Sequence, residues 1–135
     1  MDWITNHVAI GNYREAGDRS FLASQGIRSV LSLDGTLSST HASTLGVVEV
    51  VGYRLIDGEG NDGRIFRLVI DDLIRMVEAA PPVLVHCHAG RSRSAVVVAA
   101  YLMRVDHLEP AEAIARIASR RVIAITPELL ALLEG

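Results

Sequence analysis

The segment His86–Ser94 (HCHAGRSRS) holds the residues of this chain whose types and spacing are best suited to chemistry. Cys87 and Arg93 stand six positions apart. If the segment curls into a ring, its amide N–H groups point inward and form a nest for a tetrahedral oxyanion. The same positive field favours a thiolate over a thiol, so we expect Cys87 to be nucleophilic at neutral pH. The segment therefore predicts a cysteine nucleophile at the bottom of an oxyanion site.

Other residues of this loop have predicted supporting roles. The planar guanidinium of Arg93 can hold two oxygens of a phosphoryl group, which a lysine could not do equally well. The Ser94 hydroxyl can donate a hydrogen bond to the sulfur of Cys87 and steady the thiolate. Gly90 can supply a backbone conformation that a side chain would forbid. His86 is expected to support the loop through the hydrogen bonds of its ring.

Substrate contacts are expected from six successive residues of the loop, namely His88, Ala89, Gly90, Arg91, Ser92 and Arg93. His88 and Arg91 either line the pocket wall and attract a second phosphate or point to solvent. The cysteine and its two flanking histidines do not predict a metal site. Alternate residues at a strand end face opposite ways, and no further cysteine or carboxylate cluster completes a tetrahedron. We therefore expect neither a metal nor another cofactor.

Two predicted elements place this loop between a strand and a helix. Residues 83–86 are a short apolar run typical of a buried parallel strand. They follow Pro81-Pro82, which ends an amphipathic helix predicted over 64–79. The apolar series from Ser94 to Val105 predicts a helix that is buried nearly all round. The loop thus joins the carboxyl end of a strand to the amino end of a helix, where α/β proteins bind anions.

The rest of the chain continues the same αβ pattern. Strands are predicted over 8–10, 27–33 and 47–56, and helices over 18–25 and 38–45. Pro110 and Pro127 suit the first positions of two closing helices. Because no repeat or linker divides the sequence, we expect one catalytic domain over 1–135. The predicted fold class is α/β, with a mainly parallel sheet of about four strands flanked by helices.

Composition excludes several classes of protein. The chain has 135 residues, half of them hydrophobic, which is enough for one ordinary core. A net charge of −3 argues against nucleic-acid binding. The longest apolar run, 95–103, is far too short to span a bilayer. The first residues lack the features of a signal peptide, so a cytoplasmic protein is expected, and a monomer is favoured.

These motifs carry a resemblance to the protein tyrosine phosphatase superfamily, specifically to its small dual-specificity branch. The match is His86-Cys87, five further residues and Arg93-Ser94, with Gly90 three positions after the cysteine. The resemblance implies the phosphotyrosine phosphatase fold and an aspartate on an earlier loop as proton donor. Asp57 lies 30 residues before Cys87, although Ile56 stands where many relatives have proline. Asp62 remains the alternative candidate for the acid.

The resemblance also implies a mechanism. Cys87 attacks phosphorus in line and forms a phosphocysteine, while Asp57 protonates the departing oxygen. Water then attacks the intermediate, with Asp57 acting as base. The loop amides and Arg93 hold the three equatorial oxygens throughout, and no metal is required.

Four functions compete at this stage. The leading one is a cysteine-dependent phosphatase that acts on phosphotyrosine in proteins, and on phosphoserine or phosphothreonine as well. Dual specificity is favoured because a short chain is expected to give a shallow pocket. A phosphatase for phosphoinositides or another polyphosphorylated small molecule is the alternative, since His88 and Arg91 add positive charge. A phosphate-binding module without activity is disfavoured by the intact catalytic set. A rhodanese-like sulfurtransferase is disfavoured by the acidic loop and by Ser94.

Several polar residues outside the motif have expected structural roles. Asp62 suits the cap of the helix that starts near residue 64. Glu59, Asn61 and Arg64 could touch a substrate from the loop after Asp57, but they are interpreted as solvated loop polarity. Asp34 is interpreted as a turn former. Arg120-Arg121 is too short for a polybasic patch and is expected to form an ion pair.

Overall fold

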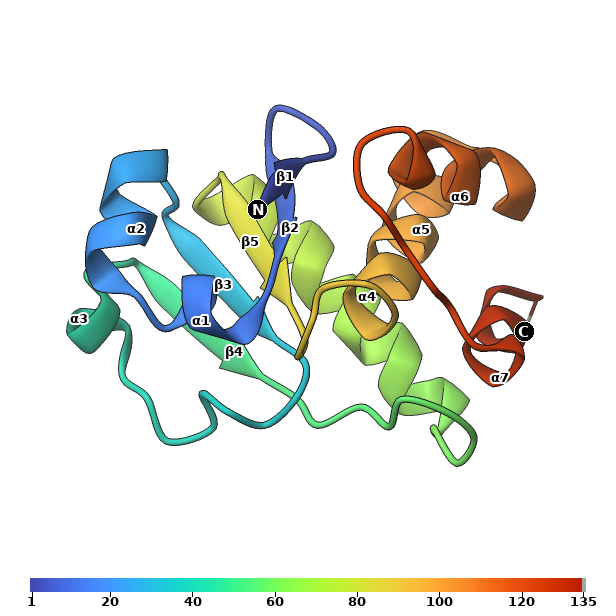
Figure 1. The fold of residues 1–135 in the computed structure, drawn as a ribbon, viewed down its shortest axis with the longest axis horizontal. Coiled ribbons are helices and arrows are strands. Elements are labelled where there is room, and N and C mark those ends of the chain that lie inside the picture. The colour runs from blue at the N-terminus through green and yellow to red at the C-terminus, as the bar shows by residue number, and fades with distance from the viewer. Residues whose placement is uncertain (135) are drawn as a thin grey trace.

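A five-stranded sheet of order β1-β2-β5-β3-β4 forms the centre of the fold (Figure 1). The structure is a computed structural model that describes residues 1–134. The strands are β1 (Asp2–Trp3), β2 (Val8–Gly11), β3 (Ser29–Ser32), β4 (Glu49–Gly52) and β5 (Val83–His86). All neighbouring strands pair in parallel except β1, which is antiparallel to β2. The strand that leads into the Cys87 loop therefore lies in the middle of the sheet.

Helices cover both faces of this sheet. They are α1 (Tyr13–Ala16), α2 (Arg19–Gln25), α3 (Ala42–Leu45), α4 (Gly63–Ala79), α5 (Arg93–Val105), α6 (Pro110–Ala118) and α7 (Pro127–Leu130), followed by the 3₁₀ turn η1 (Ala131–Glu134). Side chains alternate along the strands, so Val83 and Val85 join the core of α4 and α5, whereas Leu84 joins that of α2 and α3. Figure 1 shows the two groups of helices on opposite sides of the sheet.

The α5 helix is enclosed along most of its length. Every residue from Ser94 to Ala99 is buried, as are Tyr101 and Leu102. The helix packs between α4 and α6. Because its surroundings hold it on several sides, its amino end is fixed beside the carboxyl end of β5. No helix within residues 1–134 is long and apolar enough to cross a membrane.

The predicted fold class is confirmed, and the strand at 83–86 and the helices that begin at Pro110 and Pro127 are where the sequence predicts them. The predicted lengths of three other elements are wrong. The strands expected over 27–33 and 47–56 extend only over Ser29–Ser32 and Glu49–Gly52, because strand ends are set by pairing with a neighbour. The helix expected over 38–45 begins at Ala42. The two-residue β1 and the four-residue α1 were not predicted, because elements this short leave no periodicity.

Candidate active site

The loop between β5 and α5 curls around the sulfur of Cys87. The Cys87 side chain is buried, with its Sγ 3.2 Å from the Ser94 hydroxyl and 3.5 Å from the Ser94 amide nitrogen. A cavity of about 240 Å³ opens over this sulfur. Its walls are formed by Asp57, Cys87, His88, Ala89, Arg91, Ser92, Arg93 and Ala124. The sulfur thus lies at the base of a concave site that reaches solvent.

Arg93 enters this cavity from the first position of α5. Its Nη1 donates a hydrogen bond to the Leu55 carbonyl at 3.2 Å, which ties the arginine to the chain just before Asp57. Its Nε is buried and has no hydrogen-bond partner within residues 1–134. A buried charged donor without a partner is costly, and an anion in the cavity would supply the acceptor.

Ser92 connects the loop to Asp57. Its hydroxyl donates a 2.6 Å hydrogen bond to Oδ1 of Asp57, although the two residues are 35 positions apart. Ser92 is also the N-cap residue of α5, but its side chain caps none of the helix amides. The first amides of α5 are therefore not occupied by this side chain, and the carboxylate is held at the cavity wall.

Of the two candidate acids, only Asp57 lines the cavity. Asp62 instead accepts a hydrogen bond from the Arg64 amide at 2.7 Å and caps α4, as expected for a helix cap. The interpretation of Asn61 as solvated loop polarity is wrong. Asn61 is half-buried, accepts from the Ile56 amide at 2.8 Å and donates to the Ile56 carbonyl at 2.8 Å. These bonds fix the backbone on which Asp57 stands.

His86 supports the loop from below. The Nδ1–H of its fully buried ring donates to the Cys87 carbonyl at 3.0 Å, so its Nε2 accepts from the Ser32 hydroxyl at 2.8 Å. Burial lowers the pKa of His86, and the charge of Arg93 adds to this effect; together they outweigh the opposing effects of the Cys87 carbonyl and Asp34. The ring is therefore neutral at pH 7, as this pair of hydrogen bonds requires.

Asp34 lies next to His86, with its Oδ2 4.0 Å from Nδ1 of the ring. The predicted turn is present, because Oδ1 accepts from both the amide and the hydroxyl of Thr36. Burial alone would raise the pKa of Asp34, but the hydrogen bonds from Thr36 outweigh it and lower the pKa, and the charge of Arg93 adds to this lowering. Asp34 thus brings a negative charge close to the His86 ring that supports the loop.

The segment after α6 crosses the outer side of the loop. Arg121 donates from Nε to the Gly90 carbonyl at 2.6 Å and from Nη2 to the Ala89 carbonyl at 3.0 Å. Its Nη1 pairs with Asp2 at 2.8 Å, so the expected ion pair is present. The contacts with the loop were not predicted. Nothing in the residues around position 121 distinguishes it from Arg120, and only folding brings it to the loop.

Gly90 confirms the backbone requirement expected of it. Its φ is +69°, and a Cβ at this position would lie 2.5 Å from the Gly11 carbonyl oxygen and 2.6 Å from Nη2 of Arg121. A side chain is excluded both by the left-handed conformation and by the packed backbone. The structure therefore brings all of the predicted loop residues to one place, with Gly90 and Ser94 behind the wall rather than on it.

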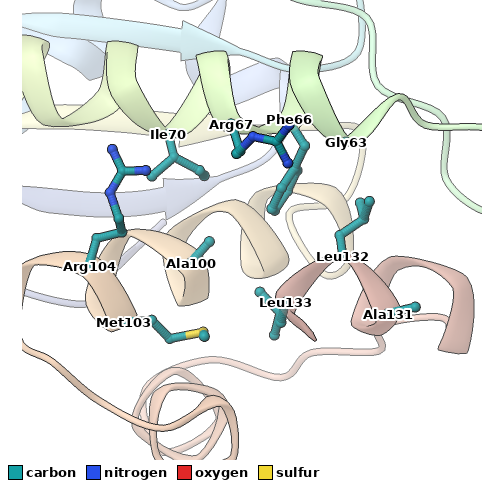
Figure 2. A pocket seen from close by; sticks show the side chains of 10 residues that line it. All are labelled: Gly63, Phe66, Arg67, Ile70, Ala100, Met103, Arg104, Ala131, Leu132 and Leu133. Atoms are coloured by element: carbon teal, nitrogen blue, oxygen red, sulfur yellow. The ribbon is translucent and has the colours of Figure 1, made fainter. Parts of the chain in front are cut away.

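A larger apolar cavity lies elsewhere, between α4, α5 and η1 (Figure 2). It measures about 270 Å³, and Phe66, Ile70, Met103 and Leu132 are among the side chains around it. It shares no lining residue with the cavity over Cys87. None of the predicted chemistry-bearing residues reaches it.

Comparison with known proteins decides the family. The family model for the dual specificity phosphatase catalytic domain matches residues 8–133. This chain belongs to that family. The match includes every residue of the Cys87 loop, Asp57 and Arg121.

Three similar proteins place the chain within this family. It is 29% identical over 125 residues to dual specificity protein phosphatase 1 of Arabidopsis thaliana, covering 90% of this chain and 60% of the relative. It is 55% identical over 53 residues to the rat phosphatidylglycerophosphatase and protein-tyrosine phosphatase 1, covering 38% of this chain and 28% of the relative. The crystal structure of human DUSP28 aligns with a TM-score of 0.85 at 26% identity, over 99% of this chain and 93% of that one. The alignments thus span less than two thirds of the length of these two curated relatives.

Proposed function

We propose that this chain is a cysteine-dependent phosphatase that hydrolyses phosphomonoesters. Its substrates include phosphotyrosine and phosphoserine or phosphothreonine. The observation that carries the proposal is the cavity that has the sulfur of Cys87 at its base and Arg93 and Asp57 in its walls. A phosphoryl group in this cavity would meet a nucleophile, a guanidinium and an acid at once. Membership of the family supports the same reaction.

In the first step, the Cys87 thiolate forms a bond to phosphorus while the ester oxygen leaves. Asp57 gives its proton to that oxygen, so the leaving group departs as an alcohol or a phenol. The hydrogen bond from Ser92 holds the acid beside the loop that carries the nucleophile. Proximity of this kind replaces an encounter in solution and lowers the barrier.

In the second step, water attacks the phosphocysteine, Asp57 accepts a proton from it, and the thiolate leaves. The Ser94 hydroxyl lies 3.2 Å from Sγ and stabilises the departing anion. The guanidinium of Arg93 and the loop amides hold the equatorial oxygens in both steps. Because these groups balance the charge of the phosphoryl oxygens, we propose a reaction that needs no metal.

The direct test is hydrolysis of para-nitrophenyl phosphate by wild type, Cys87→Ser, Asp57→Asn and Asp62→Asn. We expect Cys87→Ser to lose on the order of 10³-fold or more in kcat and Asp57→Asn about 10²-fold. Asp62→Asn should keep its kcat, because Asp62 caps α4 outside the cavity.

Two outcomes would overturn parts of this proposal. Loss of activity in Asp62→Asn with full activity in Asp57→Asn would reassign the acid. Activity that disappears with a metal chelator would refute the metal-free mechanism.

A second candidate function is hydrolysis of a lipid phosphomonoester. The rat relative, 55% identical over 53 residues, is named a phosphatidylglycerophosphatase as well as a tyrosine phosphatase. Arg91 also adds positive charge to the cavity wall. The two functions are separated by kcat/KM on a phosphotyrosine peptide against kcat/KM on phosphatidylglycerophosphate and on phosphoinositides. A hundredfold preference for a lipid would refute a protein substrate.

A further inference from the structure

Besides the apolar cavity between α4, α5 and η1, a second cavity lies beside the one over Cys87. It measures about 330 Å³ and is lined by Asn12, Tyr13, Arg14, His88, Ala89 and Arg91. His88, Ala89 and Arg91 line both cavities. β2 and β5 are parallel neighbours with Gly11 opposite His86, so α1 and the loop after β5 both begin at the carboxyl end of the strands (Figure 1). A molecule bound at Cys87 could therefore extend into the second cavity without leaving the protein surface.

The charge of this second cavity is positive. Arg14 and Arg91 are exposed, and neither has a carboxylate oxygen within 4.0 Å in the part of the chain that the structure describes. No aspartate or glutamate lines the cavity. The neighbouring Glu15 does not line the cavity, and its carboxylate accepts hydrogen bonds from the Asn12 amide and the Met1 amino group. Two guanidiniums thus stand at one cavity with no acidic side chain lining it.

The position of Arg14 relative to the Cys87 loop is set by several contacts. The Tyr13 amide donates to the His88 carbonyl at 3.1 Å, and the two rings stack with centroids 4.6 Å apart and planes 9° apart. Nε of Arg14 donates to the Tyr13 hydroxyl at 3.0 Å, and its guanidinium carbon lies 5.6 Å from the Tyr13 ring centroid. The guanidinium is therefore oriented before a ligand arrives, which reduces the entropy lost on binding.

We propose that this cavity, between Arg14 and Arg91, binds a second phosphate group of the substrate. The inference rests on the proposed phosphatase activity and names its preferred substrate class, which is compact molecules that carry two phosphates. One phosphate reacts at Cys87, and Arg14 and Arg91 hold the other through charge-assisted hydrogen bonds. Because the two cavities share three lining residues, a short linker between the phosphates is sufficient.

The test compares propane-1,3-diol bisphosphate with 3-hydroxypropyl phosphate, which differ only in the second phosphate. We expect kcat/KM to be about tenfold higher for the bisphosphate, which corresponds to about 1.4 kcal/mol. The difference should lie in KM, because the second phosphate is far from the reacting bond. It should also shrink as salt is added, since the two arginines are exposed.

Variants connect this preference to the cavity. Arg14→Gln should reduce the ratio of the two kcat/KM values to about threefold or less, and Tyr13→Phe should reduce it partly, because it frees the guanidinium while keeping the ring stack. Arg28→Gln is the matched control, since Arg28 is exposed and lines neither cavity. It should leave the ratio unchanged.

The source of the second phosphate is resolved by two further substrates. A soluble inositol bisphosphate and a vesicle lipid with the same headgroup present the same chemistry, and an Arg14-dependent gain on either supports the proposal. A gain seen only on a doubly phosphorylated peptide would overturn the compact substrate class. Equal kcat/KM for the two propanediol phosphates would overturn the second phosphate site. Absence of hydrolysis of every phosphomonoester would instead refute the proposed function.

Discussion

Replacing Arg121 by methionine tests how the Cys87 loop keeps its amides directed into the cavity. Arg121 donates to the carbonyls of Ala89 and Gly90 from the outer side of the loop. In a trans peptide the N–H points opposite to the C=O of the same unit. Holding these two carbonyls outward therefore turns the amides of Gly90 and Arg91 toward the cavity. Arg121→Met keeps much of the side-chain volume and removes these donors.

The expected magnitude follows from the contacts that are lost. A hydrogen bond from a charged donor contributes about 1.5–3 kcal/mol, and the bond to Ala89 is discounted because it is exposed. We expect the free energy of unfolding to fall by about 2–3 kcal/mol. Removing one preorganised oxyanion donor costs roughly 10²–10³-fold in kcat, and amides that are loosened rather than removed should cost less. We expect kcat to fall by about 10–100-fold.

The assay is kcat on para-nitrophenyl phosphate together with denaturant unfolding of the same samples. Arg120→Met is the neighbouring control, and Asp2→Asn removes only the ion pair of Arg121. Both controls should keep kcat within about twofold, because neither touches the loop carbonyls. If Arg121→Met loses stability but retains the kcat of wild type, Arg121 does not orient the amides and the reasoning fails.

Three further predictions concern the loop and its supports. Gly90→Ala should abolish activity and lower the melting temperature, because its Cβ would lie 2.5 Å from a carbonyl oxygen; a folded variant with wild-type kcat would contradict this. Asn61→Ala should lower kcat several-fold by freeing the Asp57 backbone while iodoacetamide alkylation of Cys87 continues at the wild-type rate; unchanged kcat would argue against it. The pKa of His86 is lower in the folded state than in the unfolded state, so the unfolded state binds the proton first as the pH falls below about 6.5. The free energy of unfolding, measured by denaturant titration, should therefore fall faster for wild type than for His86→Gln over this pH range. Parallel stability curves would refute this last assignment.

Much of the candidate site could be predicted because it is local in sequence. Cys87, Arg93 and Ser94 lie on one short loop, so their spacing alone indicates that they meet. Asp57 required the family resemblance in addition, since its own surroundings indicate no catalytic role and the sequence shows only that Asp62 suits a helix cap. The structure distinguishes the two by their partners, which are Ser92 for Asp57 and the Arg64 amide for Asp62.

The residues that support the loop from a distance could not be predicted. Arg121 contacts the loop from 31 positions away, and Ser32 meets the His86 ring across 54 positions. Asn61 is close in sequence to Asp57, but its side chain acts through backbone groups, and polar loop residues are usually solvated. In each case the partner is a carbonyl, an amide or a hydroxyl, which almost every segment of the chain possesses.

The sequence by itself determined the α/β class, the central buried strand, the enclosed helix after it and the chemistry of the loop between them. These features depend on hydrophobic periodicity and on short-range spacing, which can be recognised from the order of the residues alone. Only the tertiary structure decided which aspartate lines the cavity, which arginine holds the loop carbonyls and that Arg14 stands beside Arg91. Those pairings depend on strand order and on helix placement, and both are set by the packing of the whole core rather than by any local run of residues.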